Sequence, residues 1–316
     1  MFSSLDLKIW TTIAYSDQFY YPLTKNEIYQ RLASSEESIQ TTDNKLVSLN
    51  DIKIRLDSYV VKNWIYQHNN HYGLKAGYLD TDAFVDAVDD RKRKKETSVK
   101  IRRESQALLG ICLKIPWILA IGISGAVAVD NACVNDDLDF LMVVQKNRLW
   151  LTRSILLIFS LIKGKKLPFW NHNLLQKDRW CFNLWMEEDK LGINNTRHNL
   201  FTAYEIMQID WLFDRTDIEQ RFVFENKWVA KFLFNYPVGD CCKTTIKKST
   251  DGNLALLAVN KIIYNLEKSH LSKKNLIPQE NLALSQAWMH DNTSYIKYLD
   301  GFESLLNETI SAFSKH

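Results

Sequence analysis

The apolar and polar residues of the first 80 positions follow helical periods and then a hairpin pattern. Two stretches begin with capping signals, because Thr24 stands three residues before Glu27 and Ser48 stands three residues before Asp51. The second stretch continues with apolar residues at helical spacing: Leu49, Ile52, Leu56, Tyr59 and Val60. Two short apolar runs then flank the polar residues 68–71 (HNNH). The pattern predicts three helices and a hairpin.

This order of helices and hairpin in residues 1–80 resembles a winged helix-turn-helix domain, with the helix from Ser48 as the recognition helix and the hairpin as the wing. The resemblance implies that Lys53, Arg55 and Lys62 contact the phosphates of DNA or structured RNA. A small packing or dimerisation module is the alternative, because the few basic residues alternate with acidic ones.

Residues 81–113 have the pattern of one long helix that connects two modules. The helix carries a basic run at residues 91–95, and Lys100, Arg102 and Arg103 continue it. Runs of this kind are mostly solvated helix faces, and a groove for a polyanion is the alternative.

The apolar residues 107–129 are numerous enough to cross a membrane, which requires roughly 20 residues. Lys114 and Pro116 interrupt them, and acidic residues follow directly. We therefore expect the end of a helix that leads into a buried strand, and no association with a membrane.

Three β-favouring runs and one apolar helix follow in residues 114–190. The runs WILAIGIS, DLDFLMVV and RWCFNLWME predict strands, and NRLWLTRSILLIFSLI predicts a helix between the second and the third. Residues 191–316 have the pattern of several amphipathic helices, one of them over FTAYEIMQIDWLFDR with a core stripe of Phe201, Tyr204, Met207 and Trp211. The expected fold class is α+β, with a small mixed sheet between helical regions.

Two acidic residues open the second predicted strand. Because side chains two positions apart in a strand share a face, Asp137 and Asp139 are expected to lie a few ångströms apart. Like charges this close raise each other's pKa unless a cation lies between them. Mg²⁺ and Mn²⁺ take such oxygen ligands and leave positions open for phosphate oxygens. The pair predicts a divalent metal site for a nucleoside triphosphate (NTP) substrate.

A glycine turn, Ser124-Gly125-Ala126, ends the first predicted strand upstream of the aspartates. Glycine allows close approach of the backbone, and amides at the start of the next helix can bind a phosphate. Arg148 and Arg153 flank the start of the helix after the second strand. Arg148 is a candidate to reach the triphosphate, and ordinary capping and surface charge is the alternative.

Strand, glycine turn, acid-x-acid and strand in this order resemble the signature of the nucleotidyltransferase superfamily, which includes DNA polymerase beta, poly(A) polymerase and CCA-adding enzymes. The chain is similar to bacterial and archaeal proteins that fuse an N-terminal winged helix to a minimal nucleotidyltransferase domain. The stretches that carry this likeness are YPLTKNEIYQRL, DDLDFLMVVQKNRLWLTR, CFNLWM and FTAYEIMQIDWLFDR. The resemblance implies Mg²⁺-dependent transfer of NMP from an NTP, such as ATP, to a hydroxyl of RNA, a protein or a small molecule.

Two positions depart from that signature. Gly125-Ala126 stands where the superfamily has Gly-Ser, so the hydroxyl that touches a phosphate is missing unless Ser124 replaces it. Asn183 stands where the third strand is expected to supply a third carboxylate; it can coordinate a metal but cannot act as a base. By analogy with small-molecule nucleotidyltransferases, Glu205 is a candidate base for the acceptor hydroxyl, and a surface or salt-bridge role is the alternative.

Composition changes this picture little. The net charge of +3 over 316 residues does not by itself imply a nucleic-acid partner. The five cysteines form no C-x-x-C pair, and we expect reduced thiols in a cytoplasmic protein without a signal peptide. Two further hypotheses stay open: a catalytically degenerate protein that senses nucleotide and binds nucleic acid, and the toxin of a toxin–antitoxin pair.

Overall fold

The N-terminal residues form a helical module that is closed by a small sheet. The computed structural model describes residues 2–34, 47–75, 79–165, 179–237, 253–273, 277–289 and 293–314. The module has the helices α1 (Ser4–Asp17), α2 (Lys25–Gln30) and α4 (Leu49–Val61). Its strands pair antiparallel in the order β1-β3-β2, with bounds Leu23–Thr24 for β1, Ile65–His68 for β2 and His71–Leu74 for β3.

Local signals explain these elements. Both predicted capping boxes are present, at Thr24 for α2 and at Ser48 for α4. In the predicted hairpin turn, Asn69 and Asn70 have φ values of 45° and 60°. Asparagine tolerates this left-handed conformation, which a two-residue turn between antiparallel strands requires. The three helices and the hairpin predicted from the sequence are thus confirmed.

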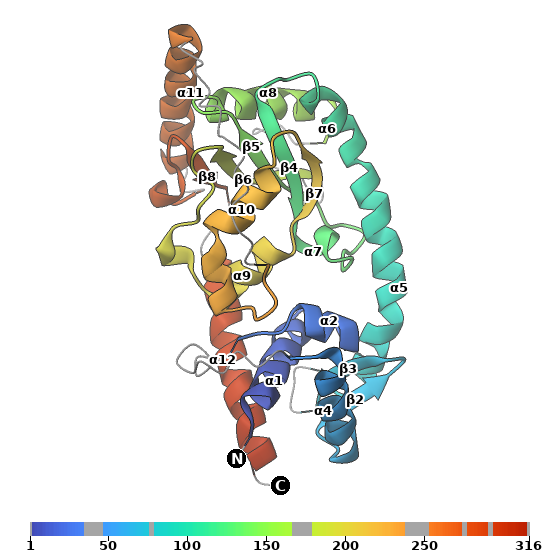
Figure 1. The fold of residues 1–316 in the computed structure, drawn as a ribbon. Helices are drawn as coiled ribbons and strands as arrows, with labels where there is room; N and C mark the ends of the chain where they lie inside the picture. The colour runs from blue at the N-terminus through green and yellow to red at the C-terminus, as the bar shows by residue number, and fades with distance from the viewer. Residues whose placement is uncertain are drawn as a thin grey trace.

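The predicted connecting helix is divided into α5 (Thr81–Arg103) and α6 (Ser105–Cys112). The division falls at Glu104, whose carboxylate lies 2.6 Å from Lys165 Nζ and 3.2 Å from Arg179 Nη2. Helical periodicity continues through this position, so the sequence pattern alone does not mark the break. In Figure 1, α5 runs along one side of the molecule from the N-terminal module to the larger sheet.

The larger sheet has five strands in the order β7-β4-β5-β6-β8. Their bounds are Ile118–Ser124 for β4, Leu138–Val144 for β5, Trp180–Glu187 for β6, Asp210–Asp214 for β7 and Gln286–Trp288 for β8. β5 and β6 pair parallel, and the three other neighbouring pairs of this sheet are antiparallel. The short helix α7 (Gly125–Ala128) connects β4 to β5, and the apolar helix α8 (Leu149–Ile162) lies between β5 and β6 in the chain.

The sequence pattern predicted a helical C-terminal third, but the structure also has strands there. It contains α9 (Leu200–Met207), α10 (Ile218–Glu225), α11 (Leu254–Lys273) and α12 (Thr293–Ser314), with 3₁₀ turns at Asn195–Arg197, Lys227–Lys231 and Gln279–Asn281. It also supplies the two edge strands of the sheet, β7 and β8. The helix predicted over residues 201–215 ends at Met207, and Trp211 lies in β7 because the free edge of β4 offers hydrogen-bond partners there.

The two faces of the sheet bury different partners. Alternate residues of β5 face a core shared with α6, α8 and α11, and the residues between them face a core shared with α9, α12 and the N-terminal module. The second core includes Phe313 of α12, whose ring centroid lies 5.0 Å from that of Trp10 and 4.9 Å from that of Trp64. In Figure 1, α12 accordingly reaches from beside α9 down to α1.

The apolar residues 107–129 end α6 and form β4 and α7, as expected. Among the described residues, no helix combines the length and apolar character that a membrane crossing needs.

Candidate functional site

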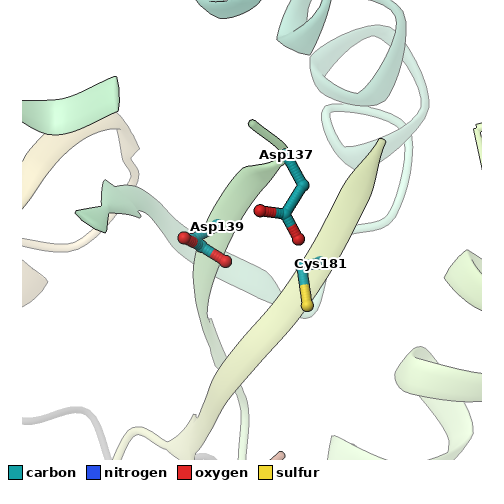
Figure 2. Close-up of side chains that lie close together, drawn as sticks. All are labelled: Asp137, Asp139 and Cys181. Carbon is teal, nitrogen blue, oxygen red and sulfur yellow. The ribbon is translucent and has the colours of Figure 1, made fainter. Parts of the chain in front are cut away.

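The two predicted metal ligands lie at the start of the central strand. Asp137 directly precedes β5, and Asp139 is its second residue. Ligand atoms of Asp137, Asp139 and Cys181 all lie within 4.8 Å of one another. Figure 2 shows the three side chains gathered where β5 and β6 begin. The expectation that the two aspartates lie a few ångströms apart is therefore confirmed.

The glycine turn lies directly against Asp139. Antiparallel pairing of β4 with β5 brings Ser124 opposite Asp139, and Gly125 follows with a φ of +67°. A Cβ atom at position 125 would lie 2.6 Å from Asp139 Oδ2, which is too close. Glycine is thus needed twice, for its left-handed backbone and for the room that it leaves to the carboxylate. Ala126, the next residue, packs its methyl group against the core under α8.

Strand β6 contributes an amide and a thiol to the same place. Asn183 Nδ2 donates a hydrogen bond to Asp139 Oδ1. The Cys181 thiol in turn donates to Asn183 Oδ1, with a distance of 2.9 Å between sulfur and oxygen. Asn183 was predicted from the sequence, whereas Cys181 was missed. The signal for Cys181 was its position two residues before Asn183, which places both side chains on one face of the strand.

The site concentrates negative charge in a poorly solvated position. The pKa of Asp139 lies well above its ordinary range because burial disfavours the charged form and because Asp137 and Glu205 add like charge nearby. The hydrogen bond from Asn183 acts in the opposite direction. A divalent cation would relieve the repulsion that these carboxylates exert on one another.

The donor set fits a divalent cation. Asp137 and Asp139 supply carboxylate oxygens, the ligands that Mg²⁺ and Mn²⁺ prefer. Cys181 adds a sulfur atom, which suits Zn²⁺ better than Mg²⁺. Its proton is directed at Asn183, so the two carboxylates are the residues that would hold a hard ion.

A cavity of about 230 Å³ adjoins Asp139, between the sheet and α9. Four of the predicted site residues line it: Ser124, Asp139, Asn183 and Glu205. Glu205 comes from α9, and burial raises its pKa to about 7. The structure thus brings Glu205, whose side chain is partly buried, to the cavity beside the metal-site aspartate. Arg197 and Trp288 also line the cavity and were not predicted.

The two predicted phosphate-binding arginines lie elsewhere. Arg148 follows the other end of β5, roughly 20 Å from Asp139 at about 3.3 Å per strand residue, and it is fully buried. Arg153, on α8, forms an ion pair with Glu267 of α11. The aspartates lie at the start of β5 and α8 begins after its end, so the seven residues of the strand separate the two.

The basic residues of the N-terminal module are engaged with protein groups. Lys53 Nζ lies 2.6 Å from Asp57 Oδ2, and Arg55 Nη1 lies 3.4 Å from Asp6 Oδ1. Lys62 Nζ lies 4.4 Å from the centre of the Trp64 ring. These three residues were the predicted phosphate contacts, and each already has a partner within the chain.

The basic run on α5 and the residues around it hold the segment between the glycine turn and the aspartates. Lys94 Nζ donates to Asn131 Oδ1 at 3.0 Å, and Arg102 Nη2 donates to the carbonyl of Val127 at 2.8 Å. From the N-terminal module, the Tyr21 hydroxyl donates to the carbonyl of Val129 at 2.8 Å. This part of the run therefore has a structural role.

In comparisons with known proteins, no family model matches the chain, and no curated protein and no solved structure matches it.

Of the cysteines, Cys112, Cys133 and Cys181 are in no disulfide. Cys241 and Cys242 lie outside the described residues.

Proposed function

We propose that the protein is a metal-dependent nucleotidyltransferase, which transfers NMP from an NTP to a hydroxyl group. The observation that carries the proposal is the contact between the glycine turn and the paired acids: Gly125 leaves room for Asp139 Oδ2, and Asp137 lies alongside. A strand end that combines a left-handed glycine with two carboxylates suits a metal-bound triphosphate.

Each residue of the site has a separate role in this proposal. Asp137 and Asp139 would hold Mg²⁺ or Mn²⁺, and that ion would neutralise the triphosphate and polarise its α-phosphate. Asn183 keeps Asp139 in position through its hydrogen bond. Glu205, with a pKa of about 7, accepts the proton of the attacking hydroxyl. The hydroxyl oxygen bonds to the α-phosphorus, and pyrophosphate leaves with the electrons of the broken P–O bond.

The proposal extends to the architecture. Residues 2–75 have the helix order and three-stranded sheet that support a winged helix. Residues 114–190 hold β4, β5 and β6, which carry the site. The predicted phosphate contacts Lys53 and Arg55 are exposed and form ion pairs within the chain, which are weak at the surface, so the N-terminal module alone neither supports nor opposes a nucleic-acid acceptor.

The test is transfer of label from α-³²P-labelled NTPs, in Mg²⁺ or Mn²⁺, to the small-molecule, RNA and protein fractions of a cell extract. We expect Asp137→Asn and Asp139→Asn to abolish labelling. Asp189→Asn is the matched control, since Asp189 pairs with Lys146 at 2.8 Å beyond the far end of β5 and β6. Labelling by the Asp137→Asn/Asp139→Asn double variant at the wild-type rate would exclude the proposal. NTP binding without transfer would favour the degenerate nucleotide sensor.

A further inference from the structure

The cavity beside Asp139 is lined mainly by apolar side chains. Apolar side chains of the sheet, of α9 and of the segment after α9 supply most of the lining, among them Leu141, Leu184, Phe201, Ile206, Ile209 and Trp288. Walls of this kind favour ligands whose apolar surface leaves water on binding. The polar groups Ser124, Asn183 and Thr202 are a minority of the lining.

The size of the cavity limits its occupant. An apolar cavity of about 150 Å³ binds benzene in another protein, and pockets for drug-sized ligands begin at about 300 Å³. A volume of about 230 Å³ therefore suits one ring with a short substituent, or a branched chain of similar bulk. The sugar, base and phosphate of a nucleic-acid end together exceed this space.

The charged groups of the wall disfavour an anionic occupant. Asp139 and Glu205 both border the cavity, so an anion that binds there without a bridging cation would face two acidic groups. Arg197 is the cation of the wall; it donates to Asn281 Oδ1, and its guanidinium carbon lies 4.4 Å from the centre of the Trp288 ring. An uncharged ligand meets neither repulsion nor the need to displace these contacts.

We propose that this cavity is the acceptor subsite of the transferase and that the acceptor is a small, uncharged, mainly apolar alcohol. The reaction rests on the proposed function, whereas binding of the alcohol does not. The alcohol oxygen lies between Asp139 and Glu205 and forms the bond to the α-phosphorus of the NTP. The bond from that phosphorus to the bridging oxygen breaks, pyrophosphate leaves with the electron pair, and the hydroxyl proton passes to Glu205.

The first test measures binding of benzyl alcohol to the whole chain by ligand-observed NMR, with benzoate as an anionic ring of similar size. We expect benzoate to bind at least about tenfold more weakly. Leu184→Trp, which fills the cavity, is expected to weaken benzyl alcohol about tenfold as well. The matched control is Leu266→Trp, on the exposed face of α11. Ile209→Phe is a second filling variant, in case Leu184→Trp does not fold.

Equal binding to the wild type and to both filling variants would overturn the subsite, as would tighter binding of benzoate. Displacement of benzyl alcohol by a non-hydrolysable ATP analogue would assign the cavity to the nucleobase and also overturn it. Binding without label transfer from any α-labelled NTP would support the subsite and contradict the proposed function. Transfer to RNA that neither filling variant slows would support the proposed function and overturn the subsite.

Discussion

Replacing Asp139 with asparagine is expected to stabilise the metal-free protein while it removes the response to metal. Asp139 is poorly solvated, and its carboxylate oxygens lie within 4.8 Å of a ligand atom of Asp137. Two unit charges at this distance repel each other by ~3 kcal/mol at an effective dielectric constant of about 20. The hydrogen bond from Asn183 offsets part of this, by about 1.5–3 kcal/mol for a charged acceptor. Asp139→Asn also removes the burial penalty on the charged carboxylate, so it should raise the free energy of unfolding by at least about 1 kcal/mol.

Saturating Mn²⁺ should reverse the order of stability. A ligand at 100 times its dissociation constant stabilises the folded state that binds it by about 2.7 kcal/mol. The wild type should gain this stabilisation, and Asp139→Asn should gain little because the site has lost one of two carboxylates. Urea unfolding followed by circular dichroism, in EDTA and again in MnCl₂, measures both effects in the same preparation.

The control for this experiment is Asp189→Asn, which removes a carboxylate paired with Lys146 away from the site. Its stability should change by no more than about 0.5 kcal/mol, and its response to Mn²⁺ should match that of the wild type. The reasoning is refuted if Asp139→Asn is less stable than the wild type in EDTA. It is equally refuted if Mn²⁺ stabilises both proteins to the same extent.

Three other substitutions test separate parts of the structure. Asn183→Asp adds a third carboxylate in place of a donor, so we expect lower stability in EDTA and tighter Mn²⁺ binding by calorimetry; unchanged affinity would contradict this. Gly125→Ala is expected to lower the free energy of unfolding by about 1–2 kcal/mol because of its left-handed backbone, and by more because the new Cβ atom would lie too close to Asp139. Gly164→Ala, with a φ of +62° and no atom near the new Cβ, should lose only the backbone share. Equal losses in the two variants would refute the contact with Asp139. Burial raises the pKa of Asp17 to about 7, so Asp17 alone should lower the free energy of unfolding by roughly 4 kcal/mol as pH rises from about 4 to 7, and by nothing further above that. Glu205, whose pKa burial also raises, adds a fall of its own over the same range. The pH dependence measured by urea unfolding should therefore be flatter in Asp17→Asn by the share of Asp17, and an equal slope would exclude this origin.

The elements that the sequence predicted well depend on neighbours along the chain. Capping at Thr24 and Ser48 needs residues three positions apart, and the turn at Asn69 needs only its own backbone. The same holds for Asp137 and Asp139, since a strand places alternate side chains on one face whatever lies beside it. These features were predictable because their physical causes are local.

The parts that were not predicted depend on pairing between distant segments. Cys181 reaches the aspartates through the parallel register of β6 with β5, which shifts between Asp139 and Leu141. The end of α9 before Trp211 depends on the open edge of β4, to which β7 pairs. Arg148 stands at the start of α8 as expected, but the length of β5 separates it from the aspartates, so the expectation that it reaches a triphosphate there is wrong.

Hydrogen bonds to residues 127–131 connect α5 and the N-terminal module to the site. This segment joins the glycine turn to the aspartates, and its carbonyls at Val127 and Val129 accept hydrogen bonds from Arg102 and Tyr21. Hydrogen bonds that involve a charged group stabilise by about 1.5–3 kcal/mol, and loss of Arg102 would leave its carbonyl partner to solvent alone. Arg102 Nε also lies 2.9 Å from Asp210, at the start of β7, so one side chain ties α5 to both the turn and the sheet edge. Lys94 and Arg102, two of the basic residues of α5, therefore have a structural role at the site.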